Sequence, residues 1–382
     1  MATLTMPSDL VSSAASARPL RVMIAGGGTG GHLFPGIALA EQVVAAGGEV
    51  RFVGTDRGIE AKAVPEYGYS LDKIEVSGIK GRGIKGLIAG LLRLPKAWLQ
   101  SRRIIKRFDP DVVVGVGGYA SGPIVATAWL LRRPTAILEQ NSVPGVTNRI
   151  LGKLVRRVFA TFPDAHGHFP ARKVVLAGNP IRAALVERLE QARSEAASEA
   201  TSRPVRQFVF GGSQGARAIN QAMTGAAAAL AEALPGVEIW HQTGAGELDA
   251  TRAGYAEAGL SEPQVRVVPF IKDMSEPYAW CDLVICRAGA TSLAELAAVG
   301  CPALLIPFPH AADDHQTHNA KSLVDVGAAV MVAEPQLDRD RLVAEVTGLL
   351  GDSERLASMR ANMLAAAKPQ AAASIYAALE QL

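Results

Sequence analysis

Two glycine-rich turns, one in each half of the chain, constrain the fold more than any other feature. The first, at 27–31, follows the apolar run 20–25, and an apolar helix is expected to begin after it near Phe34. The second, at 211–215, follows the apolar run 208–210 and also precedes a helix-like segment. Backbone N–H groups at a helix N-terminus can hold an anion, because that end of the helix carries partial positive charge. The pattern therefore predicts two nucleotide-type domains that face a central cleft, and a substrate that carries phosphate.

Short apolar runs alternate with helix-like segments along almost the whole chain, which predicts an α/β fold with parallel sheets. The Asn179-Pro180 pair and the charged, Ala-rich segment 187–203 form the predicted boundary between the halves. The architecture that follows is two Rossmann-like, doubly wound domains. We expect strands near 20–26, 49–54, 71–76, 111–116, 134–139, 157–161, 206–211, 237–242, 265–268, 282–286, 302–306 and 329–332.

Length and composition exclude several classes of protein. A chain of 382 residues suits two domains, and its net charge of +3 is too small to indicate a nucleic-acid partner. No run reaches the roughly 18 uncharged apolar residues that a membrane span needs, and the Ser/Ala-rich start lacks the pattern of a secretory signal. We therefore expect a cytoplasmic protein with a disordered tail. Cys281, Cys286 and Cys301 lack C-x-x-C spacing and are expected to be buried.

His32 directly follows the first glycine turn. An imidazole at such a place titrates near neutrality and can act as a general base, although it could also simply cap the turn. Gly26-x-Gly28-x-x-Gly31 also fits a dinucleotide fingerprint, so an NAD-dependent oxidoreductase is an alternative. That alternative needs an acidic ribose ligand, for which Asp56 stands nearest, and it leaves the later glycine turns unexplained.

Three further stretches place polar or glycine residues after predicted strands, where open α/β sheets bind ligands. The glycines of 115–123 allow either close approach to a ligand or tight packing. Glu139, Gln140 and Asn141 lie at the end of a predicted strand. They could contact a ligand, or they could be ordinary turn residues. In 287–295, Glu295 could accept hydrogen bonds from ribose hydroxyls, while Ser292-x-x-Glu295 also reads as a capping box.

The densest polar cluster is 310–319, with three histidines and two aspartates. It could bind a metal, but it has no cysteine and no second set of ligands elsewhere, so we expect no metal and favour recognition of sugar hydroxyls. Asp338-Arg339-Asp340 resembles the acid-x-acid metal motif of some sugar transferases, but its surroundings predict the solvated start of a helix.

A basic, amphipathic stretch near 80–107 can dock on an anionic membrane surface without spanning it. The alternative is a core-packed helix with a solvated basic face. The residues expected to associate with a membrane are Ile84, Lys85, Leu87, Ile88, Leu91, Arg93, Lys96 and Trp98.

Taken together, these motifs resemble the MurG family of bacterial N-acetylglucosaminyltransferases, which convert lipid I to lipid II in peptidoglycan synthesis. Jointly they are highly specific, and they cover most of the chain in order. The matching blocks are GGTGGHLFPG at 27–36, SGIKGRGIKG at 77–86, GVGGYASGP at 115–123, EQNSVPGVTNR at 139–149, GNPIR at 178–182, GGSQGARAIN at 211–220, HQTG at 241–244, CRAGATSLAE at 286–295 and PFPHAADDHQTHNA at 307–320.

The resemblance implies a GT-B fold, with an acceptor- and membrane-facing domain at 19–180 and a UDP-sugar-binding domain at 181–361. The Ser/Ala-rich start at 1–18, expected from its composition to be a disordered tail, lies outside the resemblance. A C-terminal helix at about 362–382 would pack back on the first domain. The donor would be UDP-N-acetylglucosamine and the acceptor the C4 hydroxyl of undecaprenyl-diphospho-N-acetylmuramoyl-pentapeptide. Transfer would invert the sugar by single displacement, with no cofactor or metal.

The resemblance also assigns residues. His32 would be the base, Ile271 would meet the uracil through its backbone, and Glu295 would hold the ribose. Ser213 would contact the diphosphate and Gln316 the sugar. The full set of expected donor contacts is Thr29, Gly30, Gly31, Asn141, Arg182, Ser213, Ile271, Ala290, Thr291, Ser292, Leu293, Ala294, Glu295 and Gln316.

The enzyme would work at the cytoplasmic face of the inner membrane as a peripheral protein, with partners in the cell-wall synthesis machinery. Another GT-B enzyme, such as a UDP-sugar-dependent glycolipid transferase, is the alternative within the same fold. It would share the C-terminal nucleotide site but need not share the 139–149 block.

Overall fold

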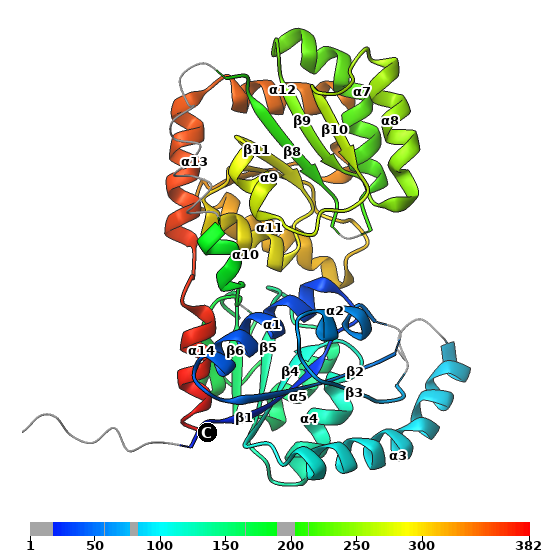
Figure 1. The fold of residues 1–382 in the computed structure, drawn as a ribbon, viewed down its shortest axis with the longest axis vertical. Helices are drawn as coiled ribbons and strands as arrows, with labels where there is room; N and C mark the ends of the chain where they lie inside the picture. Colours follow the sequence, from blue (N-terminus) through cyan, green and yellow to red (C-terminus); the bar gives the residue numbers. More distant parts are fainter. Residues whose placement is uncertain (1–17, 57, 77–82, 165, 189–202, 213) are drawn as a thin grey trace, which may run out of the picture.

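Two parallel sheets, each covered by helices on both faces, lie end to end in the computed structural model (Figure 1). The structure describes residues 18–56, 58–76, 83–164, 166–188, 203–212 and 214–382, and within 83–94 it describes the backbone alone. We call the part built on the first sheet the N-terminal domain and the part built on the second the C-terminal domain. The predicted α/β class and the two Rossmann-like domains are confirmed.

The N-terminal sheet has the strand order β3-β2-β1-β4-β5-β6-β7, and every neighbouring pair is parallel. The chain leaves β1 toward one edge of the sheet and later returns to place β4 on the other side of β1. The carboxyl ends of β1 and β4 therefore form a switch point, where such sheets bind ligands. The strands are β1 Arg21–Gly26, β2 Glu49–Gly54, β3 Leu71–Lys73, β4 Val112–Gly117, β5 Thr135–Glu139, β6 Arg157–Ala160 and β7 Val174–Leu176.

The C-terminal sheet repeats this plan with the order β10-β9-β8-β11-β12-β13, again all parallel. Its switch point lies between β8 and β11. The glycine-rich turns at 211–215 and 287–289 follow these two strands. The strands are β8 Arg206–Phe210, β9 Glu238–Gln242, β10 Val265–Val268, β11 Leu283–Cys286, β12 Ala303–Leu305 and β13 Ala329–Met331.

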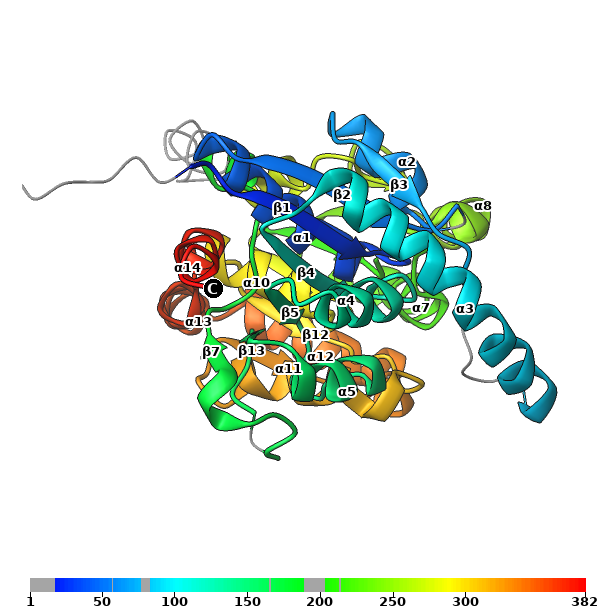
Figure 2. The same cartoon turned by 90° about the horizontal axis from the view of Figure 1, so that it is seen from below.

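Helices cover both faces of each sheet. In the N-terminal domain α3 and α4 pack side by side (Figure 2). Both contribute apolar residues to the core on one face of the sheet. The helices there are α1 Gly30–Ala45, α2 Glu60–Glu66, α3 Gly83–Phe108, α4 Ser121–Leu130 and α5 Val146–Leu154. Those that follow are α7 Arg217–Ala233, α8 Leu248–Glu257, α9 Ser275–Trp280, α10 Ala290–Val299, α11 His315–Val324, α12 Arg339–Leu350, α13 Ser353–Ala366 and α14 Ala371–Leu379.

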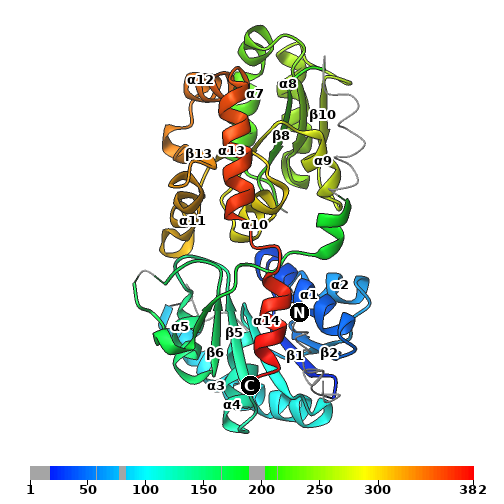
Figure 3. The ribbon, with the colours of Figure 1, turned by 90° about the vertical axis from the view of Figure 1, so that its left-hand side faces the viewer.

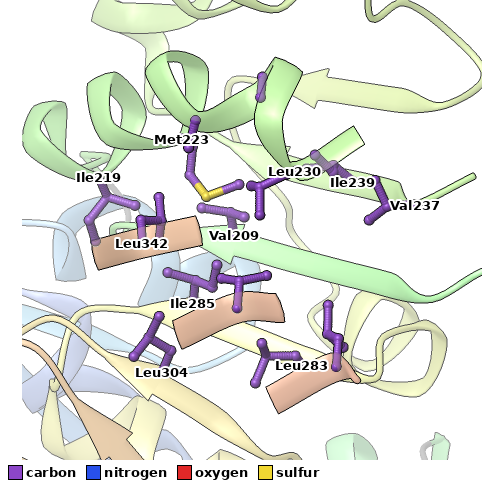
Figure 4. Close-up of a cluster of buried hydrophobic side chains, with 14 of the residues drawn as sticks. Val209, Ile219, Met223, Leu230, Val237, Ile239, Leu283, Ile285, Leu304 and Leu342 are labelled. Atoms are coloured by element: carbon purple, nitrogen blue, oxygen red, sulfur yellow. The ribbon is translucent and has the colours of Figure 1, made fainter. Parts of the chain in front are cut away.

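The central strands are buried on both faces, which explains their continuous apolar sequences. Along β8, Val209 belongs to the core on one face of the sheet, while Phe208 and Phe210 belong to the core on the other. Figure 4 shows the first of these cores, where Val209 and Ile285 from the sheet face Met223 of α7. The three cysteines are buried, as expected.

The last helix crosses to the N-terminal domain. Figure 3 shows α13 on the C-terminal domain and α14 continuing along the same side over the N-terminal domain. Ile375 and Leu379 of α14 are buried in the same core as Val22 and Ile24 of β1. This apolar contact ties the two domains together at a place remote from the glycine turns.

Each predicted strand is present, and the structure adds β7, which the sequence pattern did not indicate. The predicted start of the helix after the first glycine turn was wrong. We expected it near Phe34, but α1 begins at Gly30. Pro35 gave the misleading signal, because proline removes a backbone N–H donor from a helix interior. The Gly31 carbonyl, which loses its partner in the helix, accepts a hydrogen bond from the Thr291 hydroxyl instead.

Candidate active site

The first glycine turn is shaped by a carboxylate of the protein itself. Glu60, only 1% exposed, accepts hydrogen bonds from the Gly28 N–H at 2.7 Å and from the Thr55 N–H and hydroxyl at 3.0 and 2.8 Å. A Cβ on Gly27 would lie 2.4 Å from the Glu60 carboxyl carbon, so only glycine fits there. Glu60 was not predicted, because the acidic residue nearest the end of β2 in the sequence is Asp56.

The third glycine turn, at 115–123, packs against the first. The Gly27 N–H donates to the Gly117 carbonyl at 3.2 Å, and a Cβ on Gly118 would lie 2.2 Å from the Gly27 carbonyl oxygen. Gly117, with φ of +99°, leaves room for His32, since a Cβ there would lie 2.6 Å from the imidazole Nδ1. The tight-packing interpretation of these glycines is therefore confirmed.

His32 lies in the first turn of α1, partly buried and held by Gln140. The Gln140 Oε1 lies 3.2 Å from His32 Nδ1, while the Gln140 amide N–H donates to the Val116 carbonyl at 3.0 Å. With its N–H committed to Val116, Gln140 presents an acceptor to the imidazole, so Nδ1 carries the proton and Nε2 keeps its lone pair. Burial lowers the pKa of His32 and nearby His315 lowers it further, although the contacts with Gln140 and Val116 oppose this. The imidazole is thus neutral near pH 7 and suited to accept a proton.

The N-termini of α1 and α10 meet across the domain junction. The Thr291 hydroxyl donates to the Gly31 carbonyl at 3.1 Å. That carbonyl is four residues before Pro35, which has no N–H to bond it within the helix. The Asn179 amide in turn donates to the Thr291 hydroxyl at 3.3 Å. The structure thus brings together Gly31 and Thr291, two of the predicted donor contacts.

Glu295 is buried in the second turn of α10, where it accepts a hydrogen bond from the Tyr278 hydroxyl at 3.1 Å. Burial raises the pKa of its carboxyl to about 7. The helix begins after Gly289, which places Ser292 and Glu295 inside it. The capping-box interpretation of Ser292-x-x-Glu295 was therefore wrong, and the carboxylate is not used to cap the helix.

Arg182 connects the two sides of the site. Its guanidinium lies 5.1 Å from the Phe34 ring centroid and 5.9 Å from that of Tyr67, and it donates to the Tyr67 hydroxyl. Stacking on two rings holds a guanidinium in place through cation–π attraction. The charge of Arg182 partly offsets the effect of burial on Glu295 and lowers its pKa. A cation held by the N-terminal domain therefore acts on a carboxyl of the C-terminal domain.

The polar residues after β5 form a buried network. Glu139 accepts hydrogen bonds from the Asn141 N–H at 3.0 Å and from the Asn148 amide at 2.8 Å. Burial raises the pKa of Glu139 to about 7, although these hydrogen bonds and one from the Asn141 side chain counter the rise. Glu139 thus organises the turn that carries Asn141, and these residues are more than ordinary turn residues.

The 310–319 cluster contributes mainly to contacts within the protein. The Phe308 N–H donates to Gln316 Oε1 at 2.9 Å, Asp313 pairs with Arg149 of the other domain at 3.4 Å, and Asn319 contacts Ser142. No group of three His, Cys, Asp or Glu side chains within the described part of the chain could hold a metal ion. Asp338 caps α12 by accepting from the Arg341 N–H, which confirms the predicted helix start.

The structure describes some of the other predicted site residues and leaves others outside the described part of the chain. Thr29 and Gly30 lie at the start of α1, Ile271 packs on the C-terminal core, and Ala290, Leu293 and Ala294 lie in α10. Ser213 lies outside the described residues, as do the side chains of Ile84, Lys85, Leu87, Ile88, Leu91 and Arg93.

The described end of the basic stretch is exposed. Lys96 forms an ion pair with Glu75, and the residues Trp98 and Leu99 are 41% and 48% exposed. Among the helices that the structure describes, none is long and apolar enough to cross a membrane.

Comparison with known proteins identifies the family. Two family models match, the glycosyltransferase family 28 N-terminal domain over residues 22–160 and its C-terminal domain over residues 207–375. The chain is 52% identical, over 93% of its length and 91% of the relative's, to the UDP-N-acetylglucosamine--N-acetylmuramyl-(pentapeptide) pyrophosphoryl-undecaprenol N-acetylglucosamine transferase of Anaeromyxobacter sp. (strain K). A Myxococcus xanthus (strain DK1622) protein of the same name is 52% identical over 92% of this chain and 90% of its own.

A solved structure agrees with these relatives. The crystal structure of Acinetobacter baumannii MurG matches with a TM-score of 0.76 and 32% identity, covering 95% of this chain and all of that one. The relatives span both sheets and the junction between them. The chain therefore belongs to the MurG family of glycosyltransferases, enzymes built from two Rossmann-like domains in the GT-B arrangement.

Proposed function

We propose that this enzyme transfers N-acetylglucosamine from UDP-N-acetylglucosamine to the C4 hydroxyl of undecaprenyl-diphospho-N-acetylmuramoyl-pentapeptide, with inversion at the sugar C1. The observation that carries the proposal is the 52% identity, over 93% of the chain, to relatives named for this transfer. The two matching family models span both glycine turns, the 139–149 block and the 310–319 block. The alternative of another glycolipid transferase would not account for the 139–149 block.

The C-terminal domain, at 181–361, would bind the donor. Glu295 is a buried carboxylate one turn beyond a helix N-terminus, a position that suits a ribose beside a diphosphate. Arg182 supplies a positive charge close to it. Ile271 would contact the uracil through its backbone, Gln316 the sugar, and Ser213 the diphosphate, as the resemblance implies.

His32 would act as the general base. Its Nε2 would take the proton from the acceptor hydroxyl as that oxygen attacks C1 from the face opposite the diphosphate. The bond from C1 to the diphosphate oxygen then breaks, its electron pair leaves with UDP, and the configuration at C1 inverts. The arrangement supports this role because the Gln140 oxygen beside Nδ1 leaves Nε2 unprotonated, and burial lowers the pKa of the ring.

The departing diphosphate would gain negative charge as the bond breaks. The N-termini of α1 and α10 meet at the junction, and each presents backbone N–H groups and a positive dipole end there. Preorganised dipoles of this kind stabilise a developing anion without having to reorient. This is the contribution we assign to Gly30, Gly31, Ala290 and Thr291.

The N-terminal domain, at 19–180, would receive the lipid-linked acceptor at an anionic membrane surface. Exposed Trp98 and Leu99 on α3, together with Trp129 and Leu130 at the end of the adjacent α4, give it apolar side chains beside several cations. Such a surface binds anionic lipid through both apolar burial and charge. We propose that the enzyme works at the cytoplasmic face of the inner membrane, as the resemblance implies. Partners in the cell-wall synthesis machinery stay a prediction.

The experiment that tests the proposal is UDP release measured with and without a soluble lipid I analogue. We expect release from UDP-N-acetylglucosamine only when the analogue is present. Release that depends on a different glycolipid would favour the alternative transferase. Thermal stabilisation by NAD and not by UDP would contradict both.

A further inference from the structure

Among the described residues, Asn319 of α11 is the buried side-chain amide with the most hydrogen bonds across the domain junction, whereas the Asn179 amide makes a single one, to Thr291. Asn319 is 0% exposed. Its Oδ1 accepts from both the N–H and the hydroxyl of Ser142, each at 2.9 Å. Its Nδ2 donates to Asn141 Oδ1 and to the Ala288 carbonyl, each at 3.3 Å. A side-chain amide has two donor hydrogens and two acceptor lone pairs, so all of its capacity is used.

Three of these four hydrogen bonds reach the turn after β5 in the N-terminal domain, and the fourth anchors Asn319 to the loop after β11. The other polar contacts across the junction are more exposed. Arg149 and Asp313, for example, are 35% and 45% exposed at 3.4 Å, and ion pairs of that kind contribute little. Asn319 is therefore the polar group whose loss would leave the most buried atoms without a partner.

The contact also fixes the orientation of the Asn141 amide. Its oxygen faces Asn319, while its side-chain nitrogen is directed toward the Glu139 carboxyl. Rotating the amide by half a turn would set the Asn141 nitrogen against the Asn319 nitrogen and its oxygen against a carboxyl group. Both neighbours thus select one orientation. The second N–H of Asn141 then has a defined direction from which it can meet a substrate oxygen.

We infer that Asn319 is a positioning residue, which seats the 141–142 turn on α11 and aligns the Asn141 amide as a donor toward the sugar of the bound nucleotide. The contact between the two domains and the alignment of Asn141 toward the sugar would then form together. Asn319 joins the two domains, and it lies one helical turn after Gln316, the residue expected to contact the sugar. The inference rests on the proposed function, because it assumes that Asn141 contacts the donor sugar.

A double-mutant cycle tests the inference. Asn319→Asp keeps both acceptor contacts with Ser142 but cannot donate to Asn141 or Ala288. It therefore removes only the hydrogen bonds that the Asn319 nitrogen donates, including the one that orients Asn141. Asn141→Ala removes the group that is oriented. If Asn319 acts through Asn141, each variant lowers kcat/KM for UDP-N-acetylglucosamine by about 10- to 100-fold, and the double variant is no worse than the worse single variant.

Binding measurements separate positioning from general damage. We expect Asn319→Asp to weaken binding of UDP-N-acetylglucosamine while leaving the affinity for UDP unchanged, because UDP lacks the sugar. Ser322→Ala is the matched control, since Ser322 lies on the same helix and its hydroxyl donates within it to the Asn319 backbone carbonyl. This control should behave as the wild type. If Asn319→Asp does not fold, Ser142→Ala removes one of the four hydrogen bonds and should give a smaller loss with the same selectivity for the sugar.

Losses that multiply in the double variant would overturn the inference, as would normal kcat/KM in Asn319→Asp or an equal loss of UDP and UDP-sugar binding. Failure of the proposed function would look different, because the wild type itself would then transfer no sugar. In that case the difference between UDP and UDP-sugar affinities in the same variants still decides the role of Asn319.

Discussion

Gln140 orients His32. The Gln140 amide donates to the Val116 carbonyl at 3.0 Å, and its oxygen lies 3.2 Å from His32 Nδ1. This pair of contacts selects the imidazole tautomer whose Nε2 is unprotonated. The sequence places the two residues more than a hundred positions apart, and the switch point between β1 and β4, together with the adjacent β5, brings them together.

His32→Ala should lower kcat by about 10²- to 10⁴-fold, with a much smaller effect on donor affinity, because a base acts during transfer. In the wild type, kcat should fall as the pH drops through a value below 6.5, since burial lowers the pKa of His32 from that ordinary value. The alanine variant should lack this acidic limb. A raised donor KM with unchanged kcat would instead assign His32 to holding the turn.

Gln140→Glu should move the same acidic limb to higher pH. A carboxylate beside Nδ1 favours the protonated imidazole and therefore raises the pKa of His32. The variant should then lose activity near neutral pH and recover part of it in more alkaline buffer. A pH–rate profile identical to that of the wild type would show that Gln140 does not control the base.

Gly117→Ala should impair kcat although it adds only one methyl group. The new Cβ would lie 2.6 Å from His32 Nδ1, at a φ of +99° that favours glycine. Gly225→Ala is the matched control, since Gly225 lies within α7 with open space where the Cβ would go. The control should keep full activity and gain a little thermal stability. Equal activity of the two variants would contradict the assigned packing around His32.

Glu295→Gln should raise the donor KM by about tenfold or more, because a hydrogen bond to a charged group is worth about 1.5–3 kcal/mol. Burial raises the pKa of Glu295 to about 7, so the carboxyl becomes an anion only as the pH rises through that value. The donor KM of the wild type should therefore fall as the pH increases across this range, and that of the glutamine variant should not. A donor KM unaffected by the substitution would remove Glu295 from the site.

The raised pKa of Glu295 has a second consequence, for stability. The folded protein holds this proton more tightly than the unfolded chain, whose carboxyl has a pKa of about 4.5. The resulting contribution to the free energy of unfolding is fully present below about pH 4.5 and is lost as the pH rises through about 7. Donor binding and this contribution to stability thus change in opposite directions with pH.

Reversing charge on α3, with Lys85→Glu and Arg93→Glu together, should release the protein from anionic vesicles, since each basic residue near such a surface contributes about 1 kcal/mol. Activity on a short-chain soluble acceptor should survive. Arg339→Glu with Arg355→Glu is the matched control, because it makes the same change in charge on exposed residues of the C-terminal domain. Equal vesicle binding by the α3 variant and the wild type would refute the membrane role.

Much of the fold could be predicted because parallel strands that are buried on both faces have uninterrupted apolar sequences, as in β1 and β8. β7 escaped because three residues, Val174–Leu176, do not form a run long enough to be distinguished. The start of α1 was misjudged because Pro35 reads locally as a helix breaker, whereas the Gly31 carbonyl it releases finds a partner in Thr291 of the other domain. No local pattern carries that compensation.

The candidate site, like the fold, could be predicted only where the signal is local in the sequence. Glycine turns, His32 and Glu295 could be found because helix N-termini after strands have a recognisable sequence. Glu60 was missed, and Gln140 and Asn319 were recognised only as members of polar stretches, because the roles of all three depend on partners far away in the sequence. Several polar groups of the 310–319 cluster are used within the protein, and its recognition of sugar hydroxyls stays a prediction.

The most direct test of the central claim is the structure of the product made from UDP-N-acetylglucosamine labelled at C1 of the sugar and a soluble lipid I analogue. Nuclear magnetic resonance of the purified product gives both the configuration at the labelled carbon and the atom to which it is joined. We expect a β-linked N-acetylglucosamine on the C4 oxygen of the N-acetylmuramoyl residue, formed together with UDP. An α linkage, attachment at another oxygen, or release of free sugar without transfer would contradict this expectation.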